Sequence, residues 1–263
     1  MNRGSAIAGV VLGAIVLTGV LGPVLPYDPV ADVSPMNADL APSVAHWLGT
    51  DHLGRDVAWR LALACRAFVV PGLGACAVAA GLGVPLGALA GYHGGLTESV
   101  IRQGFSVLAT LPRFVLVLLW LSIRGSGELQ LALAAGLSFV PEIGEAVFAR
   151  IAALRHDDYV LANRAHGVPP WRILWVHLVW AACRRTIGRG LVELFGAFVV
   201  VEATLSYVGG FGVREPSPSW GNMLVFEWGR SGNPTDMVAA AVAIYIAVAA
   251  VTWVGESLAE VET

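Results

Sequence analysis

The chain has 263 residues, of which 56% are hydrophobic and 13% charged, and its mean hydropathy is +0.70. Soluble domains carry about 25% charged residues, whereas a bilayer requires about 20 consecutive apolar residues for each helical span. The formal net charge of −3 gives no basic surface for nucleic acid. All sixteen basic residues are arginine, so the chain has no lysine for a Walker A phosphate loop or for Schiff-base chemistry. The composition therefore indicates a membrane protein, and any ATP on which it depends must be bound by another chain.

Six apolar stretches predict an all-α integral membrane protein with six transmembrane helices. Each contains about 22 to 25 residues, enough to cross a bilayer with some tilt. In chain order they cover residues 4–25, 67–91, 101–123, 129–150, 187–208 and 237–258. The first exceeds the core of a signal peptide, which has about 7 to 15 residues, and is expected to be an uncleaved anchor. The abundant glycine and alanine predict close packing between helices.

The arginines predict how these helices are oriented. Many lie in or beside the segment between the fourth and fifth spans: Arg150, Arg155, Arg164, Arg172, Arg184, Arg185 and Arg189. Cytoplasmic loops of membrane proteins carry an excess of Lys and Arg, so this segment is expected in the cytoplasm. Both termini then lie inside as well, and residues 26–66 and 209–236 lie outside. Arg55, Arg60 and Arg66 on the outer side weaken the asymmetry without reversing it.

A short polar segment, "DDYVLANRAHGVPPW" at residues 157–171, interrupts the apolar sequence. Asp157 is a favourable N-cap, Gly167 is a natural C′ residue, and Pro169 and Pro170 cannot continue a helix. The predicted helix has about nine residues and is too short to be stable alone in water. It therefore needs a surface to pack on, which is either a partner protein or its own membrane domain and the lipid headgroups. Its face carries Tyr159, Ala162 and His166.

The longer segment "YVLANRAHGVPPWRILWVHLV" resembles the cytoplasmic EAA loop of ABC importer permeases in the peptide and nickel branch. That loop reads close to Y-V-E-A-A, a glycine, a proline, W-R-I-L and a histidine. The matching residues are Tyr159, Val160, Ala162, Gly167, Pro170, Trp171, Arg172, Ile173, Leu174 and His177. The sequence departs from the pattern where Leu161 replaces the glutamate, Asn163 the second alanine and Trp180 the closing proline.

Two further segments resemble the same branch. "HWLGTDHLGRDVAWRL" is similar to the signature that follows the first span of dipeptide and oligopeptide permeases, and "LSYVGGFGVREPSPSWGNML" to the segment after their fifth span. The order and spacing of the three motifs also agree with that branch, so the resemblance covers nearly the whole chain. It implies a C-type, or second, permease subunit forming one domain over residues 1–263. Within it, residues 1–25 form the first span, 26–66 an extracytoplasmic segment, and 67–258 a five-span core that includes the coupling loop 151–186.

The resemblance also implies the partners of the chain. It implies a heterodimer with a B-type permease in a bacterial inner membrane, two ATPase subunits inside and a substrate-binding protein outside. ATP and Mg would be bound by the ATPases and no cofactor by this chain. Peptides are the expected cargo, with nickel, haem or another small solute left open. The residues expected to couple to the ATPases are Tyr159, Ala162, Asn163, Arg164, His166, Gly167, Trp171 and Arg172.

The extracytoplasmic motif is expected to be structural. It comprises Leu48, Gly49, Thr50, Asp51, Gly54, Arg55 and Asp56. His46 and His52 beside its aspartates give a set that could bind metal, but we predict that Asp51 and Asp56 hold turns or pair with Arg55, and we expect no metal. The helix that follows is predicted at the outer interface, with Trp59 and its arginines near the headgroups.

Ionisable residues within spans are functional candidates. Here they are Glu142, Glu145, Glu193, Glu202 and Arg113. They either pair between helices or line a water-filled translocation path. Carboxylates of this kind could also relay protons in a stand-alone secondary transporter, which is the alternative function. The sequence shows no nucleophile, base and orienting group at usable spacing, so no catalytic centre is predicted.

Overall fold

The computed structural model describes residues 3–24, 28, 32–208, 211–214, 216–225 and 234–260, and this part of the chain is built from helices. The α-helices are α1 (Arg3–Leu21), α2 (Val57–Leu63), α3 (Cys65–His93), α4 (Gly95–Ala109), α5 (Arg113–Arg124), α6 (Glu128–Leu154), α7 (Asp158–Ala165), α8 (Pro170–Arg172), α9 (Arg184–Val208), α10 (Trp220–Met223) and α11 (Thr235–Glu260). Short 3-10 turns form η1 (Gly22–Val24) and η2 (Pro35–Asn37), and a π-helix forms η3 (Ile173–Ala182).

Most of the predicted spans correspond to long apolar helices. Four helices in the described residues are long and apolar enough to cross a membrane: α3 together with α2, then α6, α9 and α11. The apolar part of α1, Ala6–Leu21, is shorter than these four. The prediction of a helical membrane protein is therefore confirmed.

The span predicted over residues 101–123 is not one continuous helix. The chain bends by 82° between α4 and α5. Pro112 lies at the bend, where it lacks an N–H and disfavours helical geometry in Leu111 before it. The first helix therefore ends with Thr110 as its C-cap, and a new one begins at Arg113. Hydropathy does not reveal the break because both sides of it are apolar.

Glycines bring α3 and α6 into close contact. Gly83, Gly87 and Gly91 recur every four residues and so share one face of α3. A Cβ atom on Gly87 would overlap the backbone carbonyl oxygen of Gly144 on α6, and one on Gly83 would press on that of Val140. Only hydrogen fits between the two backbones, which confirms the predicted packing of small residues.

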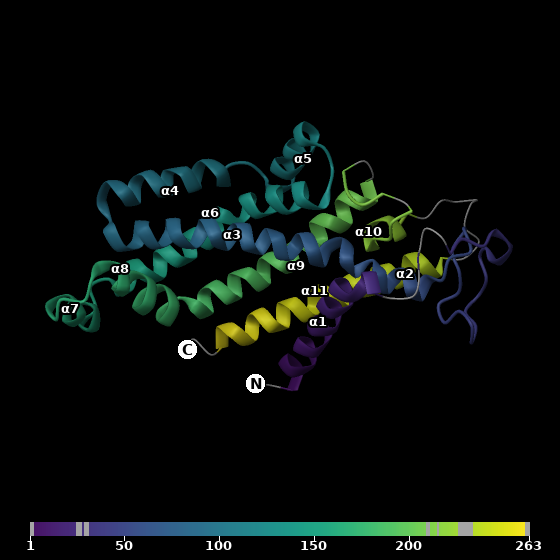
Figure 1. Ribbon diagram of the computed structural model, residues 1–263, viewed down its shortest axis with the longest axis horizontal. Coiled ribbons are helices and arrows are strands. Elements are labelled where there is room, and N and C mark those ends of the chain that lie inside the picture. The colour runs from purple at the N-terminus through teal and green to yellow at the C-terminus, as the bar shows by residue number, and fades with distance from the viewer. Residues whose placement is uncertain are drawn as a thin grey trace.

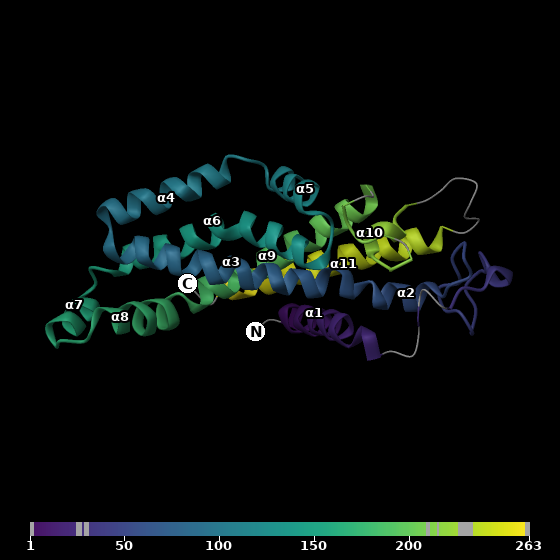
Figure 2. The same cartoon turned by 45° about the horizontal axis from the view of Figure 1, so that its top comes forward.

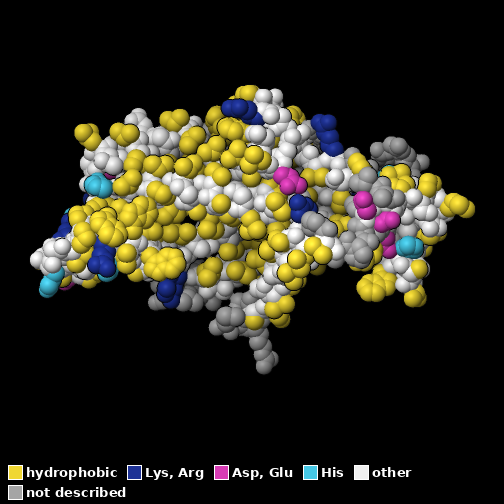
Figure 3. Space-filling model, viewed as in Figure 1, with side chains coloured by type: hydrophobic (Ala, Val, Ile, Leu, Met, Phe, Trp, Pro, Cys, Tyr) yellow, Lys and Arg dark blue, Asp and Glu magenta, His cyan; other side chains and the backbone are white. Residues whose placement is uncertain are grey.

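The long helices α3, α6, α9 and α11 run lengthwise from one end of the molecule to the other (Figures 1 and 2). The segment α7–α8 lies at one end, and residues 32–56 with α2 lie at the other. On the face shown in Figure 3, hydrophobic side chains predominate in the middle, among a few arginine and acidic side chains, with arginine and histidine at the α7 end and acidic side chains and histidine at the opposite end. An apolar band between polar ends is what a bilayer requires.

Candidate functional site

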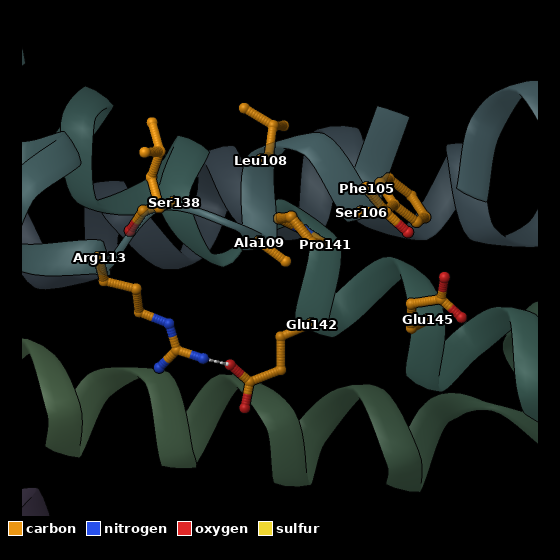
Figure 4. Close-up of a pocket in the computed structure, with 10 residues that line it drawn as sticks. Phe105, Ser106, Leu108, Ala109, Arg113, Ser138, Pro141, Glu142 and Glu145 are labelled. Atoms are coloured by element: carbon orange, nitrogen blue, oxygen red, sulfur yellow. Dashed lines mark hydrogen bonds and ion pairs between the residues drawn. The ribbon is translucent and has the colours of Figure 1, made fainter. Parts of the chain in front are cut away.

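A cavity of about 250 Å³ opens where the α4–α5 bend faces α6. Its lining residues are Phe105, Ser106, Leu108, Ala109, Leu111, Arg113, Ser138, Pro141, Glu142 and Glu145. Arg113 of α5 and Glu142 of α6 reach toward each other and form an ion pair (Figure 4). The bend is therefore a place where charged side chains gather beside an open space.

The Arg113–Glu142 pair lies far from both ends of α6. Glu142 is the fifteenth residue of this 27-residue helix, which places it near the middle of a span. Arg113 also covers the Phe139 ring, with its guanidinium carbon 4.2 Å from the ring centroid. The side chains of Arg113 and Glu142 are 46% and 45% exposed. Half-exposed charges in mid-span are costly against lipid, so this face borders water or another protein.

A second ion pair lies at the same cavity. Arg102 of α4 donates through Nε to the Glu145 carboxylate at 3.2 and 3.3 Å, and its guanidinium lies 4.6 Å from the Phe148 ring centroid. Arg102 also approaches Glu98, one turn earlier on its own helix, at 3.7 Å. Arg102 is not among the predicted path residues, although it lies within a predicted span just as the predicted carboxylates do.

The other two predicted path residues do not lie at this cavity. Glu193 pairs with Arg189 one turn away on α9, at 2.8 Å, and both side chains are half exposed. Glu202 is only 1% exposed and accepts a hydrogen bond of 2.6 Å from the Ser206 hydroxyl. That hydroxyl in turn accepts the Val213 N–H at 2.9 Å. Glu202 therefore lies beneath the segment that follows α9, and the structure groups only Arg113, Glu142 and Glu145.

At the end of the molecule that carries α2, Asp51 is the centre of a buried ion-pair network. Its Oδ1 accepts the N–H groups of Leu53 and Arg55, both at 2.9 Å. Its Oδ2 accepts Nε of Arg55 at 2.7 Å and Nη1 of Arg60. Asp51 and Arg55 are 0% exposed and Arg60 1%. Burial raises the pKa of Asp51, but the charges of Arg60 and Arg55 and the Arg55 N–H outweigh it, so the pKa is below its ordinary value.

The remaining motif residues fix the turns around Asp51. Asp56 is the N-cap of α2 and accepts the Ala58 N–H at 2.9 Å, while His46 contacts its other oxygen at 2.8 Å. Gly49 and Gly54 adopt φ of 77° and 74°, a region that favours glycine. The predicted structural role of the two aspartates is therefore confirmed. Across the residues that the structure describes, no group of three or more His, Cys, Asp or Glu side chains is placed to hold a metal ion.

One expectation for this segment is wrong. Arg60 was expected near the lipid headgroups, but it points inward to the Asp51 carboxylate. A buried carboxylate without a counter-charge is strongly destabilising, and Arg55 and Arg60 both supply positive charge to Asp51. Trp59, its neighbour in sequence, is 38% exposed, so α2 has one outward and one inward side.

Two of the sequence motifs form a single unit in the structure. The indole Nε1 of Trp220 donates to the Leu61 carbonyl oxygen at 3.0 Å, and its ring lies 4.5 Å from that of Phe68. Arg55 Nη1 donates to the Pro216 carbonyl oxygen at 3.4 Å. The segment after α9 therefore packs against α2 and the beginning of α3, about 160 residues earlier in the chain.

At the opposite end, α7 forms within the polar segment 157–171, where a short helix was predicted. Asp157 precedes it without a side-chain cap bond, and Gly167 follows it with φ of 75°, as predicted for C′. Val160 is 0% exposed and holds the helix against the protein. Of the residues expected to couple to the ATPases, Asn163 is half-buried. The rest are exposed: Tyr159, Ala162, Arg164, His166, Gly167, Trp171 and Arg172.

Cation–π and hydrogen-bond contacts connect the region around α7 to the turn between α3 and α4. The Arg164 guanidinium lies 5.0 Å from the Tyr92 ring centroid at the end of α3. Arg155, just before α7, donates through Nη1 to the Gly91 carbonyl oxygen at 3.3 Å and lies 4.0 Å from Glu98. Tyr92 was not predicted from the sequence, because no spacing rule relates it to Arg164, which lies far along the chain.

Known proteins identify the family. Residues 83–261 match the family described as binding-protein-dependent transport system inner membrane component. A dipeptide transport system permease protein of Alkalihalophilus pseudofirmus is 27% identical over 223 residues, which cover 85% of this chain and 73% of the relative. A nickel transport system permease protein of Escherichia coli is 30% identical, covering 89% and 84%, and a dipeptide permease protein of Bacillus subtilis is 31% identical, covering 83% and 68%. The chain therefore belongs to the family of binding-protein-dependent transport system inner membrane components, and it is a permease subunit of an ABC importer.

Proposed function

We propose that this chain is the second permease of a peptide importer and that α7 is its coupling helix. The observation that carries this proposal is the form of α7: it is anchored by buried Val160, presents an exposed surface, and lies at the end opposite the Asp51 network. A stand-alone secondary transporter would not require such a surface, and the related proteins give that alternative no support.

The proposed topology has six crossings. The helix α1 supplies the first crossing, and the bent pair α4–α5 counts as one, with α3, α6, α9 and α11 as the others. The arginines around α7 support a cytoplasmic location for this end, by the positive-inside rule. Both termini are then cytoplasmic, and the segments around Asp51 and Trp220 face outward.

The proposed coupling surface comprises Tyr159, Ala162, Asn163, Arg164, His166, Gly167, Trp171 and Arg172. When two ATPase subunits close on ATP and Mg, they move this surface as a rigid body. Val160 and the Arg164–Tyr92 contact pass the movement to α3, and α8 with η3 passes it to α9. Leu161, 46% exposed, offers an apolar contact where related loops carry glutamate.

The outer network is proposed to support docking of the substrate-binding protein. The buried ion pairs of Asp51 keep residues 48–56 in one shape and join them to the segment around Trp220. The cavity at Arg113, Glu142 and Glu145 is proposed to border the translocation path, shared with a B-type permease. Peptides are the proposed cargo because two of the three relatives described above are dipeptide permeases, while the third is a nickel permease.

The test of coupling is co-purification of the ATPase subunits with this chain from detergent-solubilised membranes. Ala162→Glu puts a carboxylate in the middle of the exposed surface of α7, and we expect it to abolish co-purification. Ser99→Glu adds the same charge at an exposed position on α4, and the ATPase should be retained. Equal recovery of ATPase with both variants would refute the assignment of α7.

A further inference from the structure

The charged side chains around the cavity balance each other. Arg113 pairs with Glu142, and Arg102 pairs with Glu145. These two arginines and two glutamates sum to zero. In mid-span, where an uncompensated charge is costly, a guest with zero net charge leaves this balance intact.

The cavity is also polarised from one side to the other. On its α5 side, Arg113 is the first residue of a 12-residue helix. The positive charge of Arg113 and the helix macrodipole both favour binding of an anion there. Its α6 side carries the carboxylates of Glu142 and Glu145, which favour a cation. Figure 4 shows Arg113 and Glu142 approaching from opposite sides, with Glu145 farther along α6.

The exposure of the Arg113–Glu142 pair leaves it accessible to a guest. Nearly half of each side chain is exposed, so a solute in the cavity can reach both charged groups. Exposed ion pairs have small net stability because solvent competes with them. A ligand that carries both charges can therefore replace each partner at little cost.

We infer that the cavity is a binding site for a short zwitterionic peptide, which exchanges with the Arg113–Glu142 ion pair. The peptide carboxylate takes the place of Glu142 on Arg113 and on the N-terminus of α5. The peptide ammonium takes the place of Arg113 on Glu142. The Arg102–Glu145 pair stays closed at the other side of the cavity. This inference rests on the proposed function as an importer and specifies where its cargo is recognised.

The size and chemistry of the cavity restrict the guest. Pockets for drug-sized ligands measure about 300–1,000 Å³, so a cavity of about 250 Å³ suits a dipeptide better than a long peptide. A divalent metal ion would leave two uncompensated positive charges. It would also need several nitrogen, sulfur or carboxylate ligands, and the described residues hold no such group of three.

Binding of the peptide also changes the contact between α5 and α6. With the cavity empty, the Arg113–Glu142 pair joins the two helices directly. With peptide bound, α5 and α6 are connected through the peptide, and the distance between Arg113 and Glu142 depends on the length of the peptide. Occupancy of the path is thereby communicated to the α4–α5 bend.

The test measures binding of radiolabelled dialanine to the assembled permease–ATPase complex in liposomes, without the binding protein. Competition with N-acetyl-dialanine and dialanine amide measures the penalty for losing each charged end. In the wild type each cap should weaken binding by about tenfold or more, as expected for a charge-assisted hydrogen bond. Glu142→Gln should abolish only the penalty for acetylation, and Arg113→Gln only the penalty for amidation.

Controls separate this exchange from a general effect of charge. Arg124→Gln and Glu128→Gln remove exposed charges at the far ends of the same two helices, and both penalties should remain. The double variant Arg113→Glu with Glu142→Arg keeps an ion pair between α5 and α6, and should assemble and show both penalties again. Penalties that persist in Glu142→Gln and Arg113→Gln, or that are absent from the wild type, overturn the inference. ATP-dependent uptake of dialanine with the binding protein present tests the proposed cargo separately, and its absence overturns the proposed cargo.

Discussion

Asp51→Asn is the substitution with the largest expected effect on the segment of residues 48–60. Asparagine keeps the Oδ1 acceptor for the N–H groups of Leu53 and Arg55. In place of Oδ2 it presents an amide that donates where two guanidinium groups also donate. Two charge-assisted hydrogen bonds are lost, worth about 1.5–3 kcal/mol each, and two buried cations lose their shared counter-charge.

The expected magnitude is about 3 kcal/mol. Removing one partner of a buried ion pair costs about 3–5 kcal/mol. We take the lower value because Asp236 also lies within the electrostatic reach of Arg60. Since each 1.4 kcal/mol corresponds to a factor of ten, the open form of the segment should become about a hundredfold more populated.

Trypsin reports this opening directly. The chain has no lysine, and Arg55 and Arg60 are buried, so cleavage after either requires the segment to open. When opening is fast relative to cleavage, the cleavage rate follows the open population. Glu128→Gln is the matched control, an exposed carboxylate changed to an amide, and its cleavage rate at Arg55 and Arg60 should equal that of the wild type. An increase of less than about threefold for Asp51→Asn, equivalent to about 0.7 kcal/mol, would refute the ion-pair argument.

Two further outcomes follow from the same structure. The lowered pKa of Asp51 means that its contribution to stability is complete above about pH 4, the pKa of an unfolded aspartate, and is lost as pH falls through the lower folded value. Protection factors for hydrogen exchange of residues 48–60 should therefore stay high at pH 5 and fall only well below pH 4, whereas a fall already at pH 6 would contradict the role of Asp51. Gly87→Ala should lower the melting temperature in detergent by several degrees, because overpacking costs about 1–3 kcal/mol and the added Cβ meets the Gly144 backbone. Gly81→Ala on the same helix has open space for its Cβ and should melt no lower than the wild type, so equal losses in both variants would exclude packing as the cause.

Local chemistry in the sequence was sufficient to predict several features. The apolar runs predicted the long helices, since each helix satisfies its own backbone hydrogen bonds and needs no distant residue. Gly167 predicted the end of α7 because glycine readily adopts the positive φ found there. The abundance of glycine and alanine predicted close packing between helices, and the three motifs predicted the family. Each apolar run, helix end and motif is a pattern of residues close together in the sequence.

Long-range pairing decided the rest. Hydropathy placed Arg60 at an interface, but a carboxylate nine residues earlier draws it into the interior. The bend at Pro112 brings α4 alongside α6, so that Arg102 meets Glu145 and Arg113 meets Glu142 across separations of 43 and 29 residues. Trp220 reaches the Leu61 carbonyl from 159 residues away. Hydropathy and spacing report the preference of each residue for lipid, water or a helix, whereas the choice of charged or aromatic partner depends on which helices the fold brings together, and only the tertiary structure determines that.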